Sequence, residues 1–133
     1  MDLIKITPDK ERAKSILKMV NLIEERIGLQ DRERMCALIV SDYYEIIKEL
    51  LTALLLVDGY KTLSHKDLIE YVEKNYKQFT GHEISLMNNL RILRNRVVYE
   101  GLFIDSSYLE RNESSVKKII EKLKKQVREK IMN

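Results

Sequence analysis

Apolar residues recur at helical spacing along most of the chain. A first stripe runs to Gly28, and Thr7 followed by Pro8 has the pattern of a helix N-cap and first turn. A second stretch follows Asp31, which we expect to cap it, and ends at residues 57–60. Its apolar arc is wide, which predicts the central and most buried helix. The first stripe consists of Ile16, Leu17, Val20, Ile23 and Ile27; the second contains Leu38, Ile39, Tyr43, Ile46, Ile47, Leu50, Leu51, Leu54 and Leu55.

Three capping signatures predict three further helices. Each is a serine or threonine followed three residues later by an acid, and they predict helices over 65–76, 82–99 and 107–131. Glycine at position 101 is placed as the C-terminal cap of the second of these. No strand-like alternation persists, and the short connections favour antiparallel neighbours. We therefore expect one all-α domain over residues 1–133, an up-and-down bundle of about five helices. The signatures are Ser64 with Asp67, Thr80 with Glu83, and Ser107 with Glu110.

Composition agrees with this fold class. The chain has 133 residues, of which 44% are hydrophobic and 34% charged, with one proline and four glycines. This balance is typical of a globular helical domain rather than a disordered chain. The longest apolar stretch, residues 50–57, is far shorter than the roughly 20 residues that span a bilayer. The N-terminus shows no basic segment followed by an apolar run. We expect a cytoplasmic protein that does not enter a membrane.

Several kinds of chemistry find no support in the residue pattern. The four glycines are dispersed, so no phosphate-binding loop is present, and no metal-ligand spacing occurs. His65 and His82 both lie beside helix caps and are expected at the surface. Cys36 is the only cysteine, which excludes an intrachain disulfide and suggests a buried, inert thiol. We predict no metal and no cofactor.

The formal charge is a mild +3, but its distribution is uneven. Residues 117–130 contain seven Lys or Arg and only two acids. One interpretation is a solvated helix face whose cations complement a C-terminal macrodipole. The other is a surface that attracts phosphate. In addition, the second helix offers more apolar surface than three partner helices easily cover, so we expect a homodimer.

Arg94 is the least expected residue of the chain. At about 100° per residue it falls inside the apolar arc of the fourth helix, between Leu90 and the pair Met87 and Val98. A guanidinium group cannot stay unpaired in a dry interior. Arg94 must therefore meet a carboxylate, a group of carbonyls, or a cleft that an anionic ligand can enter.

A polar stripe runs beside this apolar arc. Arg91, Asn95 and Tyr99 follow one another at i, i+4 and i+8, Asn88 lies on the same side, and Arg96 points elsewhere. An arginine fork, an amide and a phenol at a helix end can hold a phosphate or a nucleotide. The alternative is that Arg94 pairs with a carboxylate of the second helix and that the asparagines cap or bridge helices. The acids available for such a pair are Asp42, Glu45 and Glu49.

The sequence LRILRNRVVYEG, residues 90–101, resembles the late-helix signature of HEPN domains (higher eukaryotes and prokaryotes nucleotide-binding). In that family an arginine precedes a polar residue, and a histidine follows a few positions later. Arg94 matches the arginine, Asn95 the polar residue, and Tyr99 stands in place of the histidine. The order of elements over most of the chain is also similar. The resemblance implies a dimeric helical bundle whose arginine and histidine line an intersubunit cleft, often in metal-independent RNases paired with a nucleotidyltransferase antitoxin.

The replacement of histidine by tyrosine changes the expected chemistry. Histidine exchanges protons near neutral pH, whereas tyrosine has a pKa near 10 and does so only when strongly perturbed. Gly101 also occupies the position of a tyrosine in the toxin-type subgroup. We therefore expect an RNA- or nucleotide-binding module, weakly active or inactive as a nuclease, with Arg91 and Arg96 as auxiliary cations. The alternatives are a partner subunit of a nucleotidyltransferase, as in toxin–antitoxin systems, and a metal-independent endoribonuclease that uses Arg94, Asn95 and Tyr99.

Overall fold

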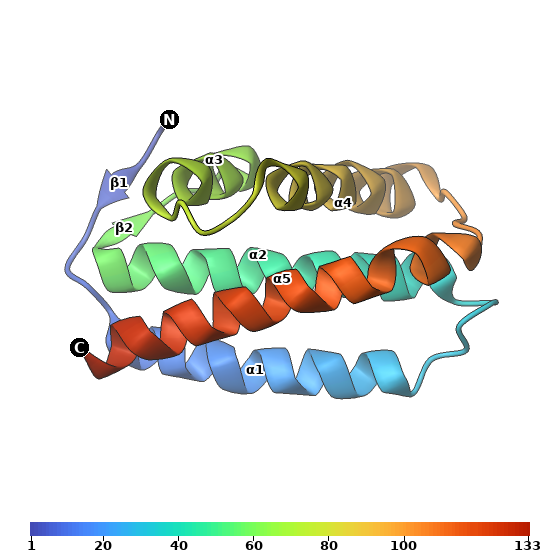
Figure 1. Ribbon diagram of the computed structural model, residues 1–133, viewed down its shortest axis with the longest axis horizontal. Coiled ribbons are helices and arrows are strands. Elements are labelled where there is room, and N and C mark those ends of the chain that lie inside the picture. Colours follow the sequence, from blue (N-terminus) through green and yellow to red (C-terminus); the bar gives the residue numbers. More distant parts are fainter.

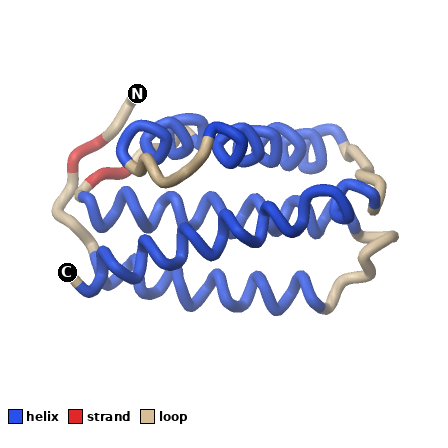
Figure 2. Tube along the Cα trace, viewed as in Figure 1, coloured by secondary structure: helices blue, strands red, loops and turns tan.

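A computed structural model describes all residues, 1–133, as a bundle of five helices with a two-residue strand pair at one end (Figures 1 and 2). The prediction of an all-α, five-helix bundle is confirmed. The elements are β1 (Ile4–Lys5), α1 (Lys10–Gly28), α2 (Cys36–Asp58), β2 (Tyr60–Lys61), α3 (His65–Asn75), α4 (Gly81–Glu100) and α5 (Ser107–Met132).

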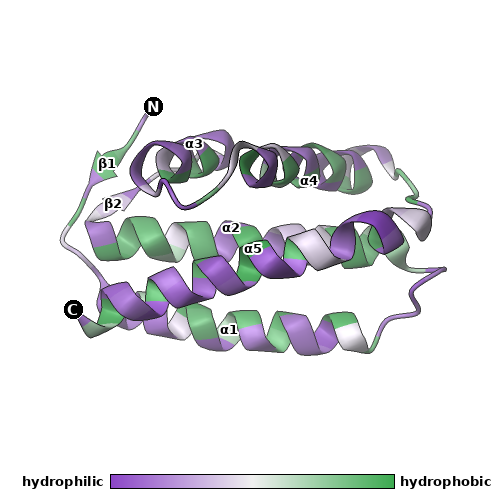
Figure 3. Cartoon of the chain, viewed as in Figure 1, coloured by the Kyte–Doolittle hydropathy of each residue, from purple (hydrophilic) through white to green (hydrophobic).

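Helix α2 is the centre of the bundle. It contacts all four other helices, and 14 of its 23 residues are buried, as its wide apolar arc predicts. Helix α1 packs along one side of α2, while α3 and α4 follow one another along another side (Figure 1). Helix α5 crosses α2, and most of its ribbon is hydrophilic in Figure 3, because only one stripe of it faces the core. Helices α1 and α4 do not pack against one another.

The apolar surface of α2 is almost fully covered. Leu38, with 52% of its surface exposed, is the only large apolar residue of α2 that remains open. The argument that α2 leaves residual apolar surface for a second subunit is therefore wrong. Apolar side chains with a larger exposed fraction lie elsewhere, among them Leu63 before α3 and Phe103 after α4.

Several helix ends differ from the prediction. Helix α1 begins after Asp9, whose carboxylate accepts the Arg12 amide at 2.9 Å, so Thr7 and Pro8 precede the helix. Asp31 does not cap α2; it accepts the amides of Glu33 and Arg34 in the preceding turn. Both acids still satisfy free backbone amides, Asp9 as the N-cap of α1 and Asp31 in the turn that precedes α2.

The segments after α2 and before α5 also differ from what the sequence predicts. Tyr60 and Lys61 form an antiparallel pair with the N-terminal segment, which the sequence did not indicate. The predicted capping box at Ser107 is also absent. Its amide is accepted instead by the Asp105 carboxylate at 2.8 Å, and its hydroxyl accepts from Arg111. By contrast, Ser64 caps α3 as predicted.

The basic residues of α5 are not one solvated face. Lys122 pairs with Glu83 at 2.6 Å, Lys130 pairs with Asp58 at 3.1 Å, and the buried Lys124 pairs with Glu24. Three of the seven cations therefore hold α5 against other elements. The exposed remainder consists of Lys117, Lys118, Lys125 and Arg128.

Candidate functional site

The helix that carries the motif is fixed at both ends. The Thr80 hydroxyl accepts the Glu83 amide at 3.1 Å, and the Glu83 carboxylate accepts the Thr80 amide at 2.9 Å, which is the predicted capping box. Lys122 joins Glu83 to α5. At the other end Gly101 adopts a left-handed conformation with φ of 67°, as the sequence predicts.

Arg94 and Arg91 are partly buried and have no acidic partner. Arg94 donates from Nη1 to the Asn95 amide oxygen at 3.3 Å, and Arg91 donates from Nε to the Asn88 amide oxygen at 3.4 Å. Neither forms an ion pair. The other seven arginines of the chain are all exposed. The pair on α4 is thus the only place where guanidinium groups leave bulk solvent without meeting a carboxylate.

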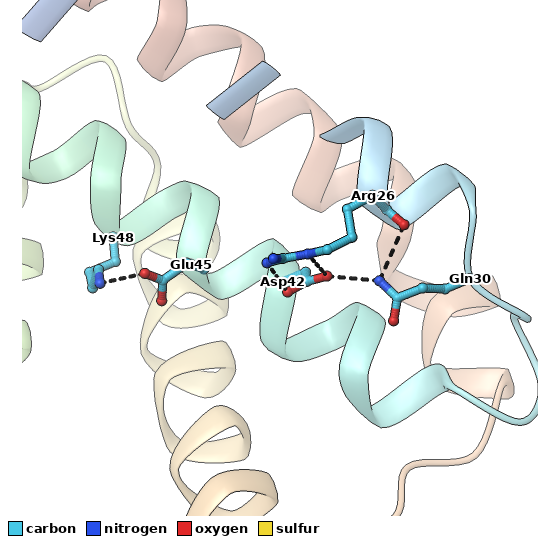
Figure 4. Close-up of polar contacts among 5 residues, drawn as sticks. All are labelled: Arg26, Gln30, Asp42, Glu45 and Lys48. Carbon is cyan, nitrogen blue, oxygen red and sulfur yellow. Dashed lines mark hydrogen bonds and ion pairs between the residues drawn. The ribbon is translucent and has the colours of Figure 1, made fainter. Parts of the chain in front are cut away.

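Asp42 is the first of the three α2 carboxylates considered as partners of Arg94. It forms its contacts on the side of α2 that faces α1. It accepts from Arg26 at 2.7 and 3.1 Å, and from the side-chain amide of Gln30 at 2.8 Å (Figure 4). Arg26 and Gln30 belong to α1 and the turn after it. Since α1 and α4 lie on different sides of α2, Asp42 is directed away from Arg94.

The remaining two carboxylates of α2 share a lysine of the same helix. Lys48 pairs with Glu45 at 2.6 Å, drawn in Figure 4, and with Glu49 at 3.2 Å. Neither acid forms an ion pair with Arg94. The interpretation of Arg94 as half of a salt bridge to α2 is therefore wrong.

The other predicted site residues lie farther out on α4. Asn95 is partly buried and accepts from Arg94. Arg96 is exposed and lies 3.6 Å from the Glu100 carboxylate. Tyr99 is 77% exposed and forms no hydrogen bond. Within one chain the five residues thus share a helix without forming one cluster: Arg91, Arg94 and Asn95 lie toward the bundle, and the other two toward solvent.

Two residues outside the motif lie close to its arginines. Tyr44 of α2 is completely buried, and its hydroxyl has no hydrogen-bond partner. His65, the first residue of α3, is partly buried, with its ring 5.8 Å from the Tyr44 ring between centroids. The expectation of a surface residue is therefore wrong for His65, although His82 is exposed. The sequence holds no signal for the contact, because it depends on how α3 folds back onto α2.

The charges of Arg91 and Arg94 affect the pKa values of both Tyr44 and His65. Burial raises the pKa of Tyr44 to about 12, against the opposing effect of Arg91 and Arg94. Burial lowers the pKa of His65, and the positive charges of Lys48, Arg94 and Arg91 lower it further, with Glu45 opposing them. Both guanidinium groups therefore lie within electrostatic reach of the phenol and the imidazole.

A separate cavity of about 510 Å³ opens between α1, α2 and α5. Its walls include Arg32, Tyr43 and Glu113, which already satisfy one another. Arg32 donates to Glu113 at 2.6 and 3.0 Å, and the Tyr43 hydroxyl donates to it at 2.6 Å. The arginine of this cavity is therefore paired with a carboxylate, in contrast to Arg91 and Arg94.

Comparison of the chain with protein-family models, with curated proteins and with solved structures gave no match. The family resemblance thus rests on the motif residues and on the order of helices. No cluster of three His, Cys, Asp or Glu side chains could hold a metal ion. None of the five helices combines the length and apolar character of a membrane span.

Proposed function

We propose that this chain is an HEPN-like module that binds RNA or a nucleotide through Arg94 and Asn95, with Arg91 beside them. The observation that carries the proposal is the pair of partly buried arginines without a carboxylate. Guanidinium groups bind phosphate through several charge-assisted hydrogen bonds. Arg96, which lies near Glu100, and the exposed Tyr99 extend the proposed surface toward solvent.

The proposal predicts a loss of RNA binding when Arg94 is replaced. Fluorescence polarisation with a short single-stranded RNA should show about tenfold weaker binding by Arg94→Gln, since a hydrogen bond to a charged group contributes about 1.5–3 kcal/mol. The dependence of affinity on salt should fall by about one phosphate contact. Arg12→Gln is the matched control, because Arg12 is exposed on α1 and has no acidic partner. Equal binding by wild type and Arg94→Gln, with both folded, would exclude this site.

Weak or absent nuclease activity is part of the same proposal. Tyr99 is exposed and has no hydrogen-bond partner in the chain that could activate its hydroxyl. A cleavage assay in EDTA, at high protein concentration and with several RNAs, tests this directly. Cleavage that disappears in both Arg94→Ala and Tyr99→Phe would instead establish the metal-independent endoribonuclease.

A second candidate is a protein-binding role, as a homodimer or as the partner of a nucleotidyltransferase. Exposed apolar side chains near the end of α4 support it: Val98 is 52% exposed and Phe103 is 89% exposed. If the motif had only a structural role in such a partner subunit, Arg94 would form a salt bridge. The carboxylates of α2 pair with other residues instead. Light scattering of wild type and Phe103→Ser tests for a dimer through this surface, and co-purification with the product of a neighbouring gene tests the other partner.

A further inference from the structure

The strongest unexplained feature near the arginines is the Tyr44 hydroxyl. The residue has no exposed surface, and its oxygen has no hydrogen-bond partner. Leaving a buried hydroxyl unpaired costs roughly 1–3 kcal/mol. The other tyrosines of α2 and α3 differ: the Tyr43 hydroxyl donates to Glu113, and the Tyr71 hydroxyl donates to Asp58. An acceptor for Tyr44 is therefore missing from the chain itself.

The groups around this hydroxyl are mostly cationic. Arg91 and Arg94 of α4 act electrostatically on the phenol, His65 of α3 lies against its ring, and Lys48 of α2 adds a positive charge beside His65. Glu45, which pairs with Lys48, is the one acid that acts on both Tyr44 and His65. Only Lys48 has acidic partners. A ligand that accepts a hydrogen bond from Tyr44 must also neutralise these cations. An anion with several oxygen atoms meets both requirements.

We propose that Tyr44, His65, Arg91 and Arg94 form one phosphate-binding site, in which the Tyr44 hydroxyl donates a hydrogen bond to a phosphate oxygen. The two guanidinium groups, which no carboxylate holds in place, move to admit the phosphate and close over it. This inference rests on the proposed function for its ligand class, but it assigns residues of α2 and α3 that lie outside the motif helix.

The site also makes binding depend on pH. His65 faces Tyr44, Glu45 and Lys48 of α2 and Arg91 and Arg94 of α4. Without a ligand, burial and the surrounding cations oppose protonation of its imidazole. A bound phosphate reverses this balance, because its negative charge favours the imidazolium ion. By linkage, phosphate must then bind more tightly to the protonated protein, so affinity rises as pH falls.

Tyr44→Phe tests the hydroxyl without removing the ring. Calorimetric titration of the full chain with inorganic phosphate should show about tenfold weaker binding by the variant, as for a lost hydrogen bond to a charged acceptor. Its unfolding midpoint in urea should be equal to or higher than that of wild type, because the removed hydroxyl has no partner. Tyr43→Phe is the matched control: it should lower stability, through loss of the bond to Glu113, and leave phosphate affinity unchanged.

His65→Gln tests the pH dependence. A short RNA without terminal phosphates is the probe, since its phosphodiesters do not titrate between pH 6 and pH 8. Wild type should bind it more tightly at pH 6, and His65→Gln should lose that difference. Repeating the titrations with 5′-AMP distinguishes a terminal phosphate from the phosphodiester of an RNA backbone, and either ligand supports the site.

Two outcomes separate this inference from the proposed function. Wild-type affinity and pH dependence in both Tyr44→Phe and His65→Gln, with weakened binding by Arg94→Gln, would overturn the four-residue site and leave the motif arginine as the ligand contact. Failure of wild type to bind phosphate, 5′-AMP and RNA at either pH would overturn both.

Discussion

The imidazole ring of His65 lies against the phenol ring of Tyr44, with centroids 5.8 Å apart and ring planes inclined by 39°. This contact joins the first turn of α3 to the middle of α2. It brings the only partly buried histidine of the chain beside the only buried side-chain oxygen that lacks a hydrogen-bond partner. The positive charges of Arg91 and Arg94 act on both rings. The motif helix and two distant segments therefore form a single electrostatic environment.

His65 should make the fold less stable in mild acid. Burial and the nearby cations Lys48 and Arg94 hold its pKa below 6.5 in the folded chain. The unfolded chain therefore binds a proton that the folded chain does not, so the free energy of unfolding falls as pH drops through 6.5 and levels off below the folded pKa. Urea denaturation between pH 5 and pH 8 should show this slope in wild type and a reduced slope in His65→Gln.

Proton NMR measures the same effect directly. The chain has two histidines, and His82→Gln identifies which imidazole signal belongs to His65. That signal should titrate below pH 6.5, and in Arg94→Gln its pKa should rise because one of the opposing charges is gone. A His65 pKa above 6.5 in the wild-type protein would contradict the buried, cation-rich environment described for it.

Glu113 should stabilise the fold at neutral pH and lose that effect in acid. A hydrogen bond from Arg32 lowers the pKa of its carboxyl, burial opposes this, and the Tyr43 hydroxyl adds a second hydrogen bond that lowers it. Its contribution is therefore fully present above the unfolded pKa and disappears as pH falls through the folded one. Glu113→Gln should be less stable than wild type by about 1–2 kcal/mol at pH 7, because Arg32 is half exposed and its ion pair is screened.

The difference between Glu113→Gln and wild type should shrink when urea denaturation is repeated at pH 3. Glu110→Gln serves as the control, since Glu110 is exposed on the same helix and has no ion pair. A pH-independent difference would mean that Glu113 acts through packing and not through its charge.

Asp58 should be among the most important polar residues for stability. Its carboxylate accepts from the hydroxyls of Tyr71 at 2.8 Å and Tyr76 at 2.5 Å and pairs with Lys130 at 3.1 Å. It thereby links the end of α2 to α3 and to the end of α5. Asp58→Ala leaves two buried phenols and a lysine without an acceptor, which should cost about 3 kcal/mol in urea denaturation. Glu73→Ala, which removes an exposed acid of α3, should cost less than about 0.5 kcal/mol.

The helices were predictable because the information is local. The spacing of Ile16, Val20, Ile23 and Ile27 predicts which face of α1 is buried, and the capping box at Thr80 predicts the start of α4. The strand pair was not predictable, since Ile4 and Lys61 meet only after α1 and α2 have packed together. Its two pairs of residues are also too short to produce a visible alternation.

The candidate site was predictable only in part. Helical geometry identified Arg94 as an arginine on an apolar face, but it could not choose between a salt bridge and a ligand. That choice depends on which partners the carboxylates of α2 meet. For Asp42 the partner is Arg26 of α1, a contact between helices that the sequence alone does not reveal. Tyr44 could not be predicted as a site residue, because a tyrosine on an apolar helix face is expected to be a core residue. Only the structure shows that its hydroxyl has no hydrogen-bond partner.

Tyr99 should contribute to RNA binding through its ring and not through its hydroxyl. The side chain is 77% exposed at the end of α4 and makes no hydrogen bond, so it presents a flat face to a base. Stacking of a base on an aromatic ring contributes about 1–3 kcal/mol when measured by alanine substitution. Tyr99→Ala should therefore weaken RNA binding in fluorescence polarisation by about tenfold or more, while Tyr99→Phe binds as wild type does. Neither change should alter stability, because the residue packs against nothing in the core. Equal loss in both variants would instead assign the function to the hydroxyl and would favour the endoribonuclease, in which the phenol takes part in proton transfer.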